Sequence, residues 1–304
     1  MSSKFLTPPF LKPGDTLGIV STARKLTPTE LQPALELFEQ WGLKIKIGPH
    51  LHKEYHQFSG TDQERATDLQ WMMEDPHVKA IYCARGGYGS VRVIDHIDWN
   101  FLKNKPKWVL GYSDVTALHN HIHTHLNMES IHAPMPLGFP ENSAECLEDV
   151  RKTLFGELSE IQCDRHPFNH LGDTQGALTG GNLSVLYSLR GTPADIDVKG
   201  KILFIEDLDE YLYHIDRMMM NLQRGGWLDE IAGLIVGGMT DMNDNKVPFG
   251  KQAIEIIKEF TEGKDYPVAF GFPAGHVDDN RPLRFGVRVE LKVREDQTLL
   301  TFPI

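Results

Sequence analysis

The first half of the chain alternates short apolar runs with segments of helical period, and this alternation limits the fold more than any other feature of the sequence. The apolar runs lie at residues 15–23, 43–49, 78–84, 108–113 and 128–135. Thr27 and Glu30 have the spacing of a capping box, which predicts the start of a helix after the first run. Thr61 and Glu64 repeat this signal before the third run. Strands joined through helices need crossover connections, so the pattern predicts a parallel sheet.

The second half has a different pattern, in which strands and helices are followed by alternating apolar and polar residues. A strand is expected at 200–207, and another follows a long helix. The alternation after residue 281 is typical of antiparallel strands. A polar, turn-rich passage from 139 to 173 separates the halves. The sequence therefore predicts an α/β protein, with an N-terminal, doubly wound, mostly parallel domain over 1–165 and a mixed, strand-rich α/β domain over 166–304.

The charge balance argues against partners that are recognised by their negative charge. Lys and Arg together number 31 and Asp and Glu 42, which gives a formal net charge of −11. Binding to nucleic acid or to an anionic membrane is therefore not expected, and a small peptide or other small molecule is the expected partner. The N-terminal residues lack a signal-peptide pattern, and the three cysteines are widely separated. These features predict a cytoplasmic protein.

Two turns follow strands of the predicted parallel sheet, at the edge where such sheets bind ligands. The first turn, 85–90, reads RGGYGS and precedes a helix expected near 90–97. It lacks the third glycine of the dinucleotide-binding motif, so a nucleotide cofactor is not favoured there. The second turn carries Ser113, before a helix expected from Asp114. Taken alone, Ser113 reads as a helix N-cap or as a nucleophile raised on the turn, and the N-cap is the more frequent role.

A serine nucleophile needs a base for its hydroxyl proton and an acid that orients the base. Glu206 ends the apolar strand at 200–207, where a carboxylate can face a cleft, although acids also gather in the first turns of helices. His276 lies in a Pro/Gly-rich loop, which suits a presented imidazole or an ordinary surface histidine. Because the chain has 14 histidines, the residues alone do not select His276.

The segment HNHIHTH places histidines four residues apart on one helix face, the spacing of paired zinc ligands. The pairs are His119 with His123 and His121 with His125. Neither the H-E-x-x-H motif nor a signal for a third ligand accompanies them, so solvated and partly packed helix residues are the expected account. No metal site is predicted.

Five motifs occur in a fixed order along the chain: ARGGYGS, GYSDVTAL, GGNLSVLYSLRGTP, LFIED and FPAGH. Together they closely resemble the LD-carboxypeptidase family of serine peptidases, which includes murein tetrapeptide carboxypeptidases and microcin C self-immunity proteins. The resemblance extends from KPGDTLGIVSTA to FGVRVEL. It implies a Ser-His-Glu triad of Ser113, His276 and Glu206, divided between two domains. It also implies an oxyanion hole formed by the backbone N–H groups of Gly87 and Asp114.

The same resemblance implies the reaction. Members of the family hydrolyse an LD-amide bond, as in the release of D-alanine from murein tetrapeptides during cell-wall recycling, and no cofactor is expected. The terminal carboxylate of such a substrate calls for a cationic or N–H partner, for which Arg85 and Asn182 are candidates. The resemblance also implies a homodimer.

Two other functions stay open. The immunity branch of the family hydrolyses peptidyl- or aminoacyl-nucleotide conjugates and holds the nucleobase with an aromatic-bearing loop. Residues 143–180 contain Phe155 and Phe168 but no Trp, which favours a murein peptide. A non-catalytic protein that keeps the fold and binds a small ligand is the third possibility.

Overall fold

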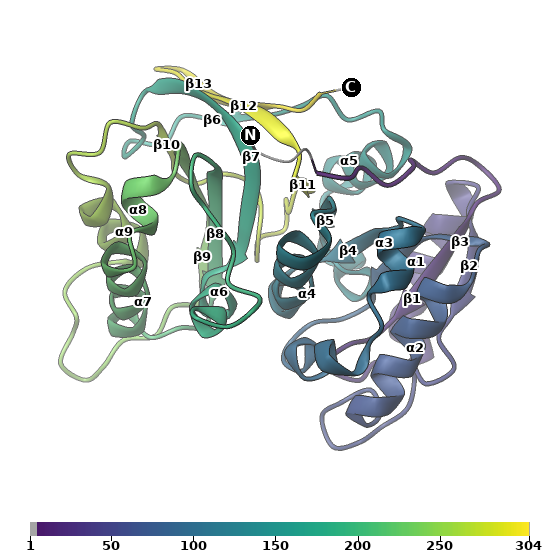
Figure 1. The fold of residues 1–304 in the computed structure, drawn as a ribbon. Coiled ribbons are helices and arrows are strands. Elements are labelled where there is room, and N and C mark those ends of the chain that lie inside the picture. The colour runs from purple at the N-terminus through teal and green to yellow at the C-terminus, as the bar shows by residue number, and fades with distance from the viewer. Residues whose placement is uncertain (1–4, 304) are drawn as a thin grey trace.

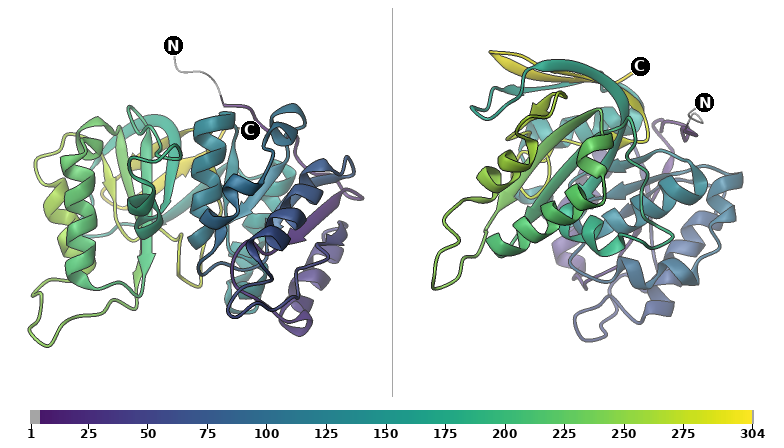
Figure 2. Two further views of the ribbon diagram at one scale, coloured as in Figure 1. Left: turned by 60° about the horizontal axis from the view of Figure 1, so that its bottom comes forward. Right: turned by 60° about the vertical axis from the view of Figure 1, so that its left-hand side comes forward.

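The computed structural model describes residues 5–303, which form two β-sheets with helices packed against them (Figure 1). The further views of Figure 2 show the two sheets, each with its own helices, as neighbouring bodies. The α/β fold class predicted from the sequence, with one parallel-rich sheet and one mixed sheet, is confirmed.

Five parallel strands of the first sheet coincide with the predicted apolar runs. They are β1 (Thr16–Val20), β2 (Lys44–Ile47), β3 (Val78–Cys83), β4 (Trp108–Gly111) and β5 (Ser130–His132). Their order in the sheet is β5-β4-β3-β1-β2, and each neighbouring pair is parallel. This doubly wound order has its topological switch point between β1 and β3, where ligands of such sheets bind beyond the carboxyl ends of the strands.

Helices cover both faces of the first sheet. They are α1 (Pro28–Gln40), α2 (Asp62–Glu74), α3 (Asn100–Asn104), α4 (Thr116–His121) and α5 (Ala144–Phe155). The apolar sides of α2, α3 and α4 join one buried cluster, and those of α1 and α5 join another on the opposite face. The capping boxes predicted at Thr27 and Thr61 are both present, at the starts of α1 and α2.

The helix expected near 90–97 is wrong, because the chain forms two short 3₁₀ turns there, Ser90–Arg92 and Ile94–His96. Gly89 precedes the first turn with a φ of 142°, and within residues 5–303 no side chain caps that turn. The segment is also rich in β-branched residues, whose restricted rotamers disfavour an α-helix. The result is an irregular connection between the glycine turn and α3.

The second sheet combines a parallel half with an antiparallel half. Its strands are β6 (Glu160–Asp164), β7 (Gly172–Asn182), β8 (Ile202–Leu208), β9 (Gly233–Thr240), β10 (Val268–Ala269), β12 (Arg288–Val293) and β13 (Gln297–Thr301). In the order β10-β9-β8-β7-β12-β13-β6, the pairs from β10 to β7 are parallel and the pairs from β7 to β6 are antiparallel. The antiparallel strands predicted after residue 281 are confirmed.

The helices of the second half are α6 (Leu183–Leu189), α7 (Leu212–Arg224), α8 (Trp227–Glu230) and α9 (Ala253–Thr261). Figure 1 shows α7, α8 and α9 on one side of β8 and β9, and the apolar residues of these helices and strands form one buried cluster. Within residues 5–303, no helix combines the length and the apolar character needed to cross a membrane.

The two sheets exchange strands along the chain. Strand β11 (Leu283–Phe285) pairs antiparallel with β5 of the first sheet, although β10 and β12 on either side of it in sequence belong to the second. Strand β6 precedes residue 165 but pairs with β13 in the second sheet. The division between 1–165 and 166–304 therefore stays a prediction, while β11 and β6 tie the two halves together.

Gly180 provides a test of how closely β7 and β8 approach. A Cβ atom on Gly180 would lie 1.9 Å from the carbonyl oxygen of Phe204, and Gly180 has a φ of +132°. Gly180→Ala is expected to lower the free energy of unfolding by more than about 3 kcal/mol or to prevent folding, as measured by urea denaturation.

Gly191→Ala is the matched control, because Gly191 also has a positive φ, +75°, but no atom of residues 5–303 lies within 4 Å of the added Cβ. Its expected cost is only the ~1–2 kcal/mol of an alanine in the left-handed region. Equal losses for the two variants would contradict the close approach at Gly180.

Candidate active site

Ser113 lies just beyond the carboxyl end of β4, in the turn that leads to α4. Its φ of 60° places it in the left-handed region, which a residue other than glycine adopts at an energetic cost. The N-cap role considered from the sequence is wrong. Ser113 is the first residue of the 3₁₀ turn Ser113–Val115, Tyr112 takes the cap position, and no side chain among the described residues caps this turn. The Ser113 hydroxyl points away to His276 instead.

Three predicted residues meet in one hydrogen-bonded line. Nε2 of His276 lies 3.2 Å from Oγ of Ser113, and Nδ1 of the same ring lies 2.6 Å from Oε2 of Glu206. Ser113 follows β4, Glu206 belongs to β8, and His276 lies in the loop between β10 and β11. In this arrangement Nε2 can accept the hydroxyl proton while Nδ1–H donates to the carboxylate.

Glu206 is fully buried near the carboxyl end of β8. The pairing of β8 with β9 changes register between Ile205 and Asp207, so Glu206 occupies an irregular position in the ladder. Such a bulge redirects a side chain out of the regular alternation of a strand. The neighbouring side chains of β8 are buried in the core, whereas the Glu206 carboxylate, at the irregular position, contacts His276.

The surroundings of His276 favour its protonated form. Burial lowers the pKa of His276, but the charge of Glu206 and its hydrogen bond to Nδ1 outweigh burial, so the pKa is raised above its ordinary value. The ring of Tyr112 packs against the imidazole, with centroids 4.7 Å apart. An imidazole in this setting takes up a proton readily and holds the charge beside a carboxylate.

Two buried charged residues anchor the glycine turn RGGYGS. The Asp114 carboxylate accepts a hydrogen bond of 2.7 Å from the backbone N–H of Ser90. The Arg65 guanidinium donates to the carbonyl of Gly89 at 3.0 Å. Burial raises the pKa of Asp114, and the bond from Ser90 partly offsets that effect. Asp114, the residue after Ser113, thus fixes the Ser90 end of the glycine turn.

The two residues predicted to supply the oxyanion hole, Gly87 and Asp114, each follow a residue at the serine: Gly87 follows Gly86, and Asp114 follows Ser113 itself. A Cβ atom on Gly86 would be 3.4 Å from Cβ of Ser113, so the glycine turn passes directly beside the serine. The N–H of Gly87 makes no hydrogen bond to another group of residues 5–303. Asp114 is the second residue of a 3₁₀ turn, where N–H groups lack an acceptor from a preceding turn. The oxyanion hole itself stays a prediction.

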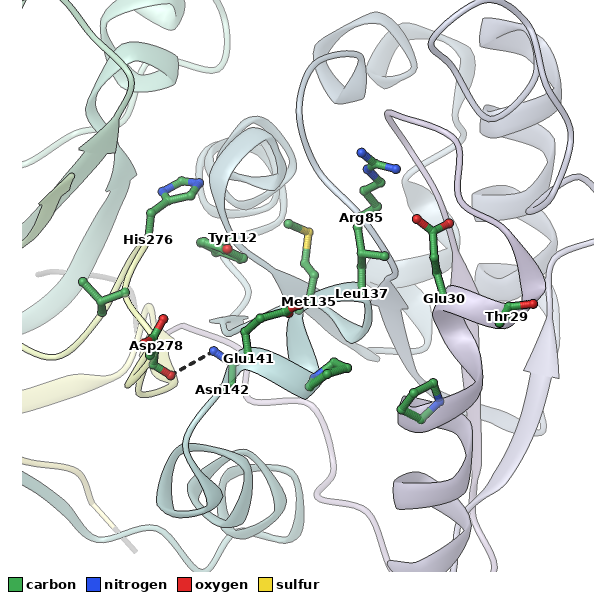
Figure 3. Close-up of a pocket in the computed structure, with 14 residues that line it drawn as sticks. Thr29, Glu30, Arg85, Tyr112, Met135, Leu137, Glu141, Asn142, His276 and Asp278 are labelled. Carbon is green, nitrogen blue, oxygen red and sulfur yellow. Dashed lines mark hydrogen bonds between the residues drawn. The ribbon is translucent and has the colours of Figure 1, made fainter. Parts of the chain in front are cut away.

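A cavity of about 570 Å³ contains Ser113, and a second one of about 700 Å³ adjoins it. Arg85, Met135 and His276 line both, so the two are arms of one cleft that meet at the imidazole. We call the cavity that contains Ser113 the serine arm. Figure 3 draws the other arm, with His276 and Tyr112 standing across it from Arg85 and Glu30. These volumes are typical of sites for small molecules and peptides.

Arg85 and Asn182, the two candidate carboxylate partners, both line the serine arm. Nη1 of Arg85 donates to the carbonyl of Lys25 at 2.6 Å. The Asn182 amide caps α6: its Oδ1 accepts from the N–H of Val185 at 3.1 Å, and its Nδ2 donates to Asp207 at 2.9 Å. Asn182 is thus largely committed to holding α6 in place.

Sequence reasoning did not select two residues of the cleft, Tyr112 and Arg24. Tyr112 lines the arm of Figure 3 and contacts His276, and Arg24 lines the serine arm. Arg24 follows β1, just as the glycine turn follows β3, so both lie at the switch point of the first sheet. The position of Arg24 just after the first predicted strand was the signal that could have identified it.

The histidines after Ser113 belong to the packing of the protein. His119 and His123 are buried, so the expectation of solvated residues is wrong for them, while their expected packing is confirmed. Burial lowers the pKa of His119 to about 4 and that of His123 to about 3, which keeps both rings neutral near pH 7. In the part of the chain that the structure describes, no three His, Cys, Asp or Glu side chains are grouped so that they could hold a metal ion.

Comparison with known proteins identifies the family. Residues 17–133 match the LD-carboxypeptidase N-terminal domain, and residues 175–291 match the LD-carboxypeptidase C-terminal domain. The chain belongs to the LD-carboxypeptidase family. It is accordingly a serine-type carboxypeptidase, as the resemblance of its motifs predicted.

Two relatives extend over most of the chain. The probable murein peptide carboxypeptidase of Bacillus subtilis is 34% identical over 302 residues, which cover 96% of this chain and 93% of that protein. The murein tetrapeptide carboxypeptidase of Pseudomonas aeruginosa is 28% identical over 286 residues, which cover 89% and 91%.

Solved structures share the whole fold of this LD-carboxypeptidase. The muramoyltetrapeptide carboxypeptidase from Oxalobacter formigenes has a TM-score of 0.85 and 25% identity, covering 95% of this chain and 99% of that one. The microcin C7 self-immunity protein in its wild-type apo state has a TM-score of 0.86 and 22% identity, covering 99% of each chain. The second likeness concerns the fold alone.

The raised pKa of His276 can be measured directly by NMR titration of its imidazole. The native protein is expected to show a pKa above 6.5 for this ring. In Glu206→Gln the stabilising charge is lost while burial remains, so the pKa should fall below the native value. Glu210→Gln is the control, because the Glu210 carboxylate binds His214, at 2.6 Å. An unchanged His276 pKa in Glu206→Gln would contradict the electrostatic pairing.

Proposed function

We propose that this LD-carboxypeptidase releases the terminal D-alanine from murein tetrapeptides in cell-wall recycling. The observation that carries the proposal is the hydrogen-bonded line of Ser113, His276 and Glu206 at the junction of a two-armed cleft. The names of the Bacillus subtilis and Pseudomonas aeruginosa relatives support the substrate class. A homodimer in the cytoplasm is part of the same proposal.

In the proposed reaction, His276 accepts the proton of Ser113 as Oγ attacks the carbonyl carbon of the LD-amide bond. The imidazolium then gives this proton to the amine of the departing D-alanine, and the acyl group stays on Ser113. Water, activated by His276, hydrolyses that ester and restores the serine. Glu206 holds Nδ1–H and stabilises the imidazolium, in accord with the raised pKa of His276.

The negative charge of the tetrahedral intermediate needs donors that are already in place. The N–H groups of Gly87 and Asp114 fill this role in the proposal, because both belong to turns next to Ser113. The turns are held by the buried Asp114 carboxylate and by Arg65, so the donors need little rearrangement during the reaction. The oxyanion position would lie between the glycine turn and the start of the turn before α4.

Arg85 and Asn182 serve as contacts for the peptide in the same proposal. Arg85 lines both arms of the cleft, so it can reach substrate groups on either side of the scissile bond. Asn182 has one Nδ2 hydrogen beyond its bond to Asp207, enough for a single contact with a carboxylate or carbonyl. Loss of either side chain should raise KM more than it lowers kcat.

Release of D-alanine from a murein tetrapeptide by the purified protein and by Ser113→Ala tests the proposed function. The native protein should release D-alanine, and Ser113→Ala should lower kcat by about 10⁴-fold or more, because the nucleophile is lost. Free D-alanine is measured by chromatography, and circular dichroism of both proteins controls for folding.

Release at equal rates by the two proteins would remove Ser113 from the mechanism. If neither protein releases D-alanine, the same pair should be given an aminoacyl-nucleotide conjugate, and Ser113-dependent hydrolysis would establish that substrate class instead. Binding without hydrolysis of either compound would favour the non-catalytic alternative.

A further inference from the structure

The serine arm contains three residues that could bind a carboxylate: Arg24, Arg85 and Asn182. Under the proposed function, the leaving residue ends in a free carboxylate, and an exopeptidase needs a group that recognises it. The three side chains differ in how much of their hydrogen-bonding capacity the fold already uses. That difference identifies the residue that is best placed for a ligand.

Arg85 and Asn182 are both partly engaged. The Asn182 amide uses its oxygen and one N–H to hold α6 and Asp207. The Arg85 guanidinium donates to the carbonyl of Lys25. The charge of Arg85 also acts on Glu30, whose pKa is lowered chiefly by the backbone N–H of Thr27 and in smaller part by Arg85. Figure 3 shows Arg85 and Glu30 next to each other on one wall of the arm without Ser113.

Arg24 differs in that its backbone is hydrogen-bonded while its guanidinium has no polar partner among the described residues. Its N–H donates to the carbonyl of Gly86 at 3.3 Å, its carbonyl accepts from the hydroxyl of Ser21 at 2.8 Å, and it forms an isolated β-bridge with Phe58. The guanidinium makes no hydrogen bond or ion pair with any of residues 5–303. An arginine with an anchored backbone, whose five N–H donors have no acceptor in the described part of the chain, lines the arm that holds the nucleophile.

The side chain of Arg24 crosses the glycine turn at Gly87. A Cβ atom on Gly87 would lie 2.5 Å from Cδ and 2.6 Å from Nε of Arg24, so the arginine packs directly against the turn at the position where Gly87 has no side chain. Gly86, the neighbour of Gly87, is in turn beside Ser113. The arginine therefore passes one residue away from the serine, across the turn that supplies the proposed oxyanion donor.

We propose that Arg24 binds the α-carboxylate of the C-terminal amino acid and so makes the enzyme specific for a free chain end. This inference rests on the proposed function and goes beyond it by naming the residue that determines specificity. The planar guanidinium can hold both carboxylate oxygens in a bidentate pair. In the substrate, the terminal carboxylate is only one residue away from the scissile carbonyl. The position of Arg24 beside the glycine turn suits a carboxylate at that distance.

The test compares a murein tetrapeptide that ends in D-alanine with the same peptide that ends in D-alaninamide. The native protein should cleave the free acid with a kcat/KM about 10- to 100-fold above that of the amide, the range of a hydrogen-bonded charge pair. In Arg24→Ala, kcat/KM for the free acid should fall to the level of the amide, while kcat/KM for the amide should change by less than about 2-fold. Arg24→Lys should restore part of the preference for the acid, because lysine keeps the charge but not the planar fork.

Lys25→Ala is the matched control, since Lys25 is the adjacent cation and its ammonium pairs with Glu54 at 2.7 Å. Its preference for the acid should equal that of the native protein. If Arg24→Ala slows both peptides equally, Arg24 only supports the glycine turn and the inference is overturned. A native protein that cleaves acid and amide at the same rate would overturn it as well.

An equilibrium measurement separates this inference from the proposed reaction. Calorimetry with Ser113→Ala, alone and combined with Arg24→Ala, gives the affinity for each peptide without turnover. Tighter binding of the acid that depends on Arg24 would sustain the carboxylate site even if the native protein released no D-alanine. Equal affinities for the acid and the amide would reject the carboxylate site at Arg24. The proposed reaction would then still be tested separately, by the release of D-alanine.

Discussion

The active site depends on one buried hydrogen bond, between the carboxylate of Glu206 and the imidazole of His276. Glu206 has no exposed surface, its Oε2 is bonded to Nδ1 of His276, and its Oε1 has no partner among residues 5–303. A carboxylate buried in this way is tolerated only beside a positive or hydrogen-bonding partner, so the fold requires His276 at this place. The same requirement raises the pKa of the imidazole and gives it the basicity that a serine nucleophile needs. The contact with His276 that the buried carboxylate needs is therefore also the contact that prepares the imidazole to act as a base.

That contact belongs to the second half of the chain, whereas Ser113 belongs to the first, so the distance of 3.2 Å between Nε2 and Oγ depends on how the halves meet. The loop after His276 is bonded to the start of α5. The backbone N–H of Ser143 donates to the carbonyl of Asp278 at 3.1 Å, and its hydroxyl donates to Asp279 at 2.6 Å. On the other side of the site, the N–H of Asn182 donates to the hydroxyl of Thr116 at 3.0 Å. Bonds on both sides of the triad thus hold the imidazole over the serine.

The sequence was sufficient for features that depend on neighbouring residues. The capping box at Thr27 and the run of β1 are local patterns, and both predict their elements correctly. Features that depend on distant residues were missed: the crossing of β11 to the first sheet, the bulge at Glu206 and the place of Arg24 in the cleft. Ser113 illustrates the limit, because its left-handed φ and its pairing with His276 are imposed by tertiary contacts rather than by a local N-cap.

Two consecutive carboxylates show how the second sheet divides its acids between chemistry and structure. Glu206 pairs with His276, whereas Asp207 accepts bonds from the amide of Asn182 and from the N–H of Ser184 at the start of α6. Burial, and then the charge of Glu206, raise the pKa of Asp207 to about 7. In its ionised form Asp207 also raises the pKa of His276, more weakly than Glu206 does. The acid that anchors α6 therefore also contributes to the basicity of the imidazole, so the structure of this strand end and the electrostatics of the site cannot be varied independently.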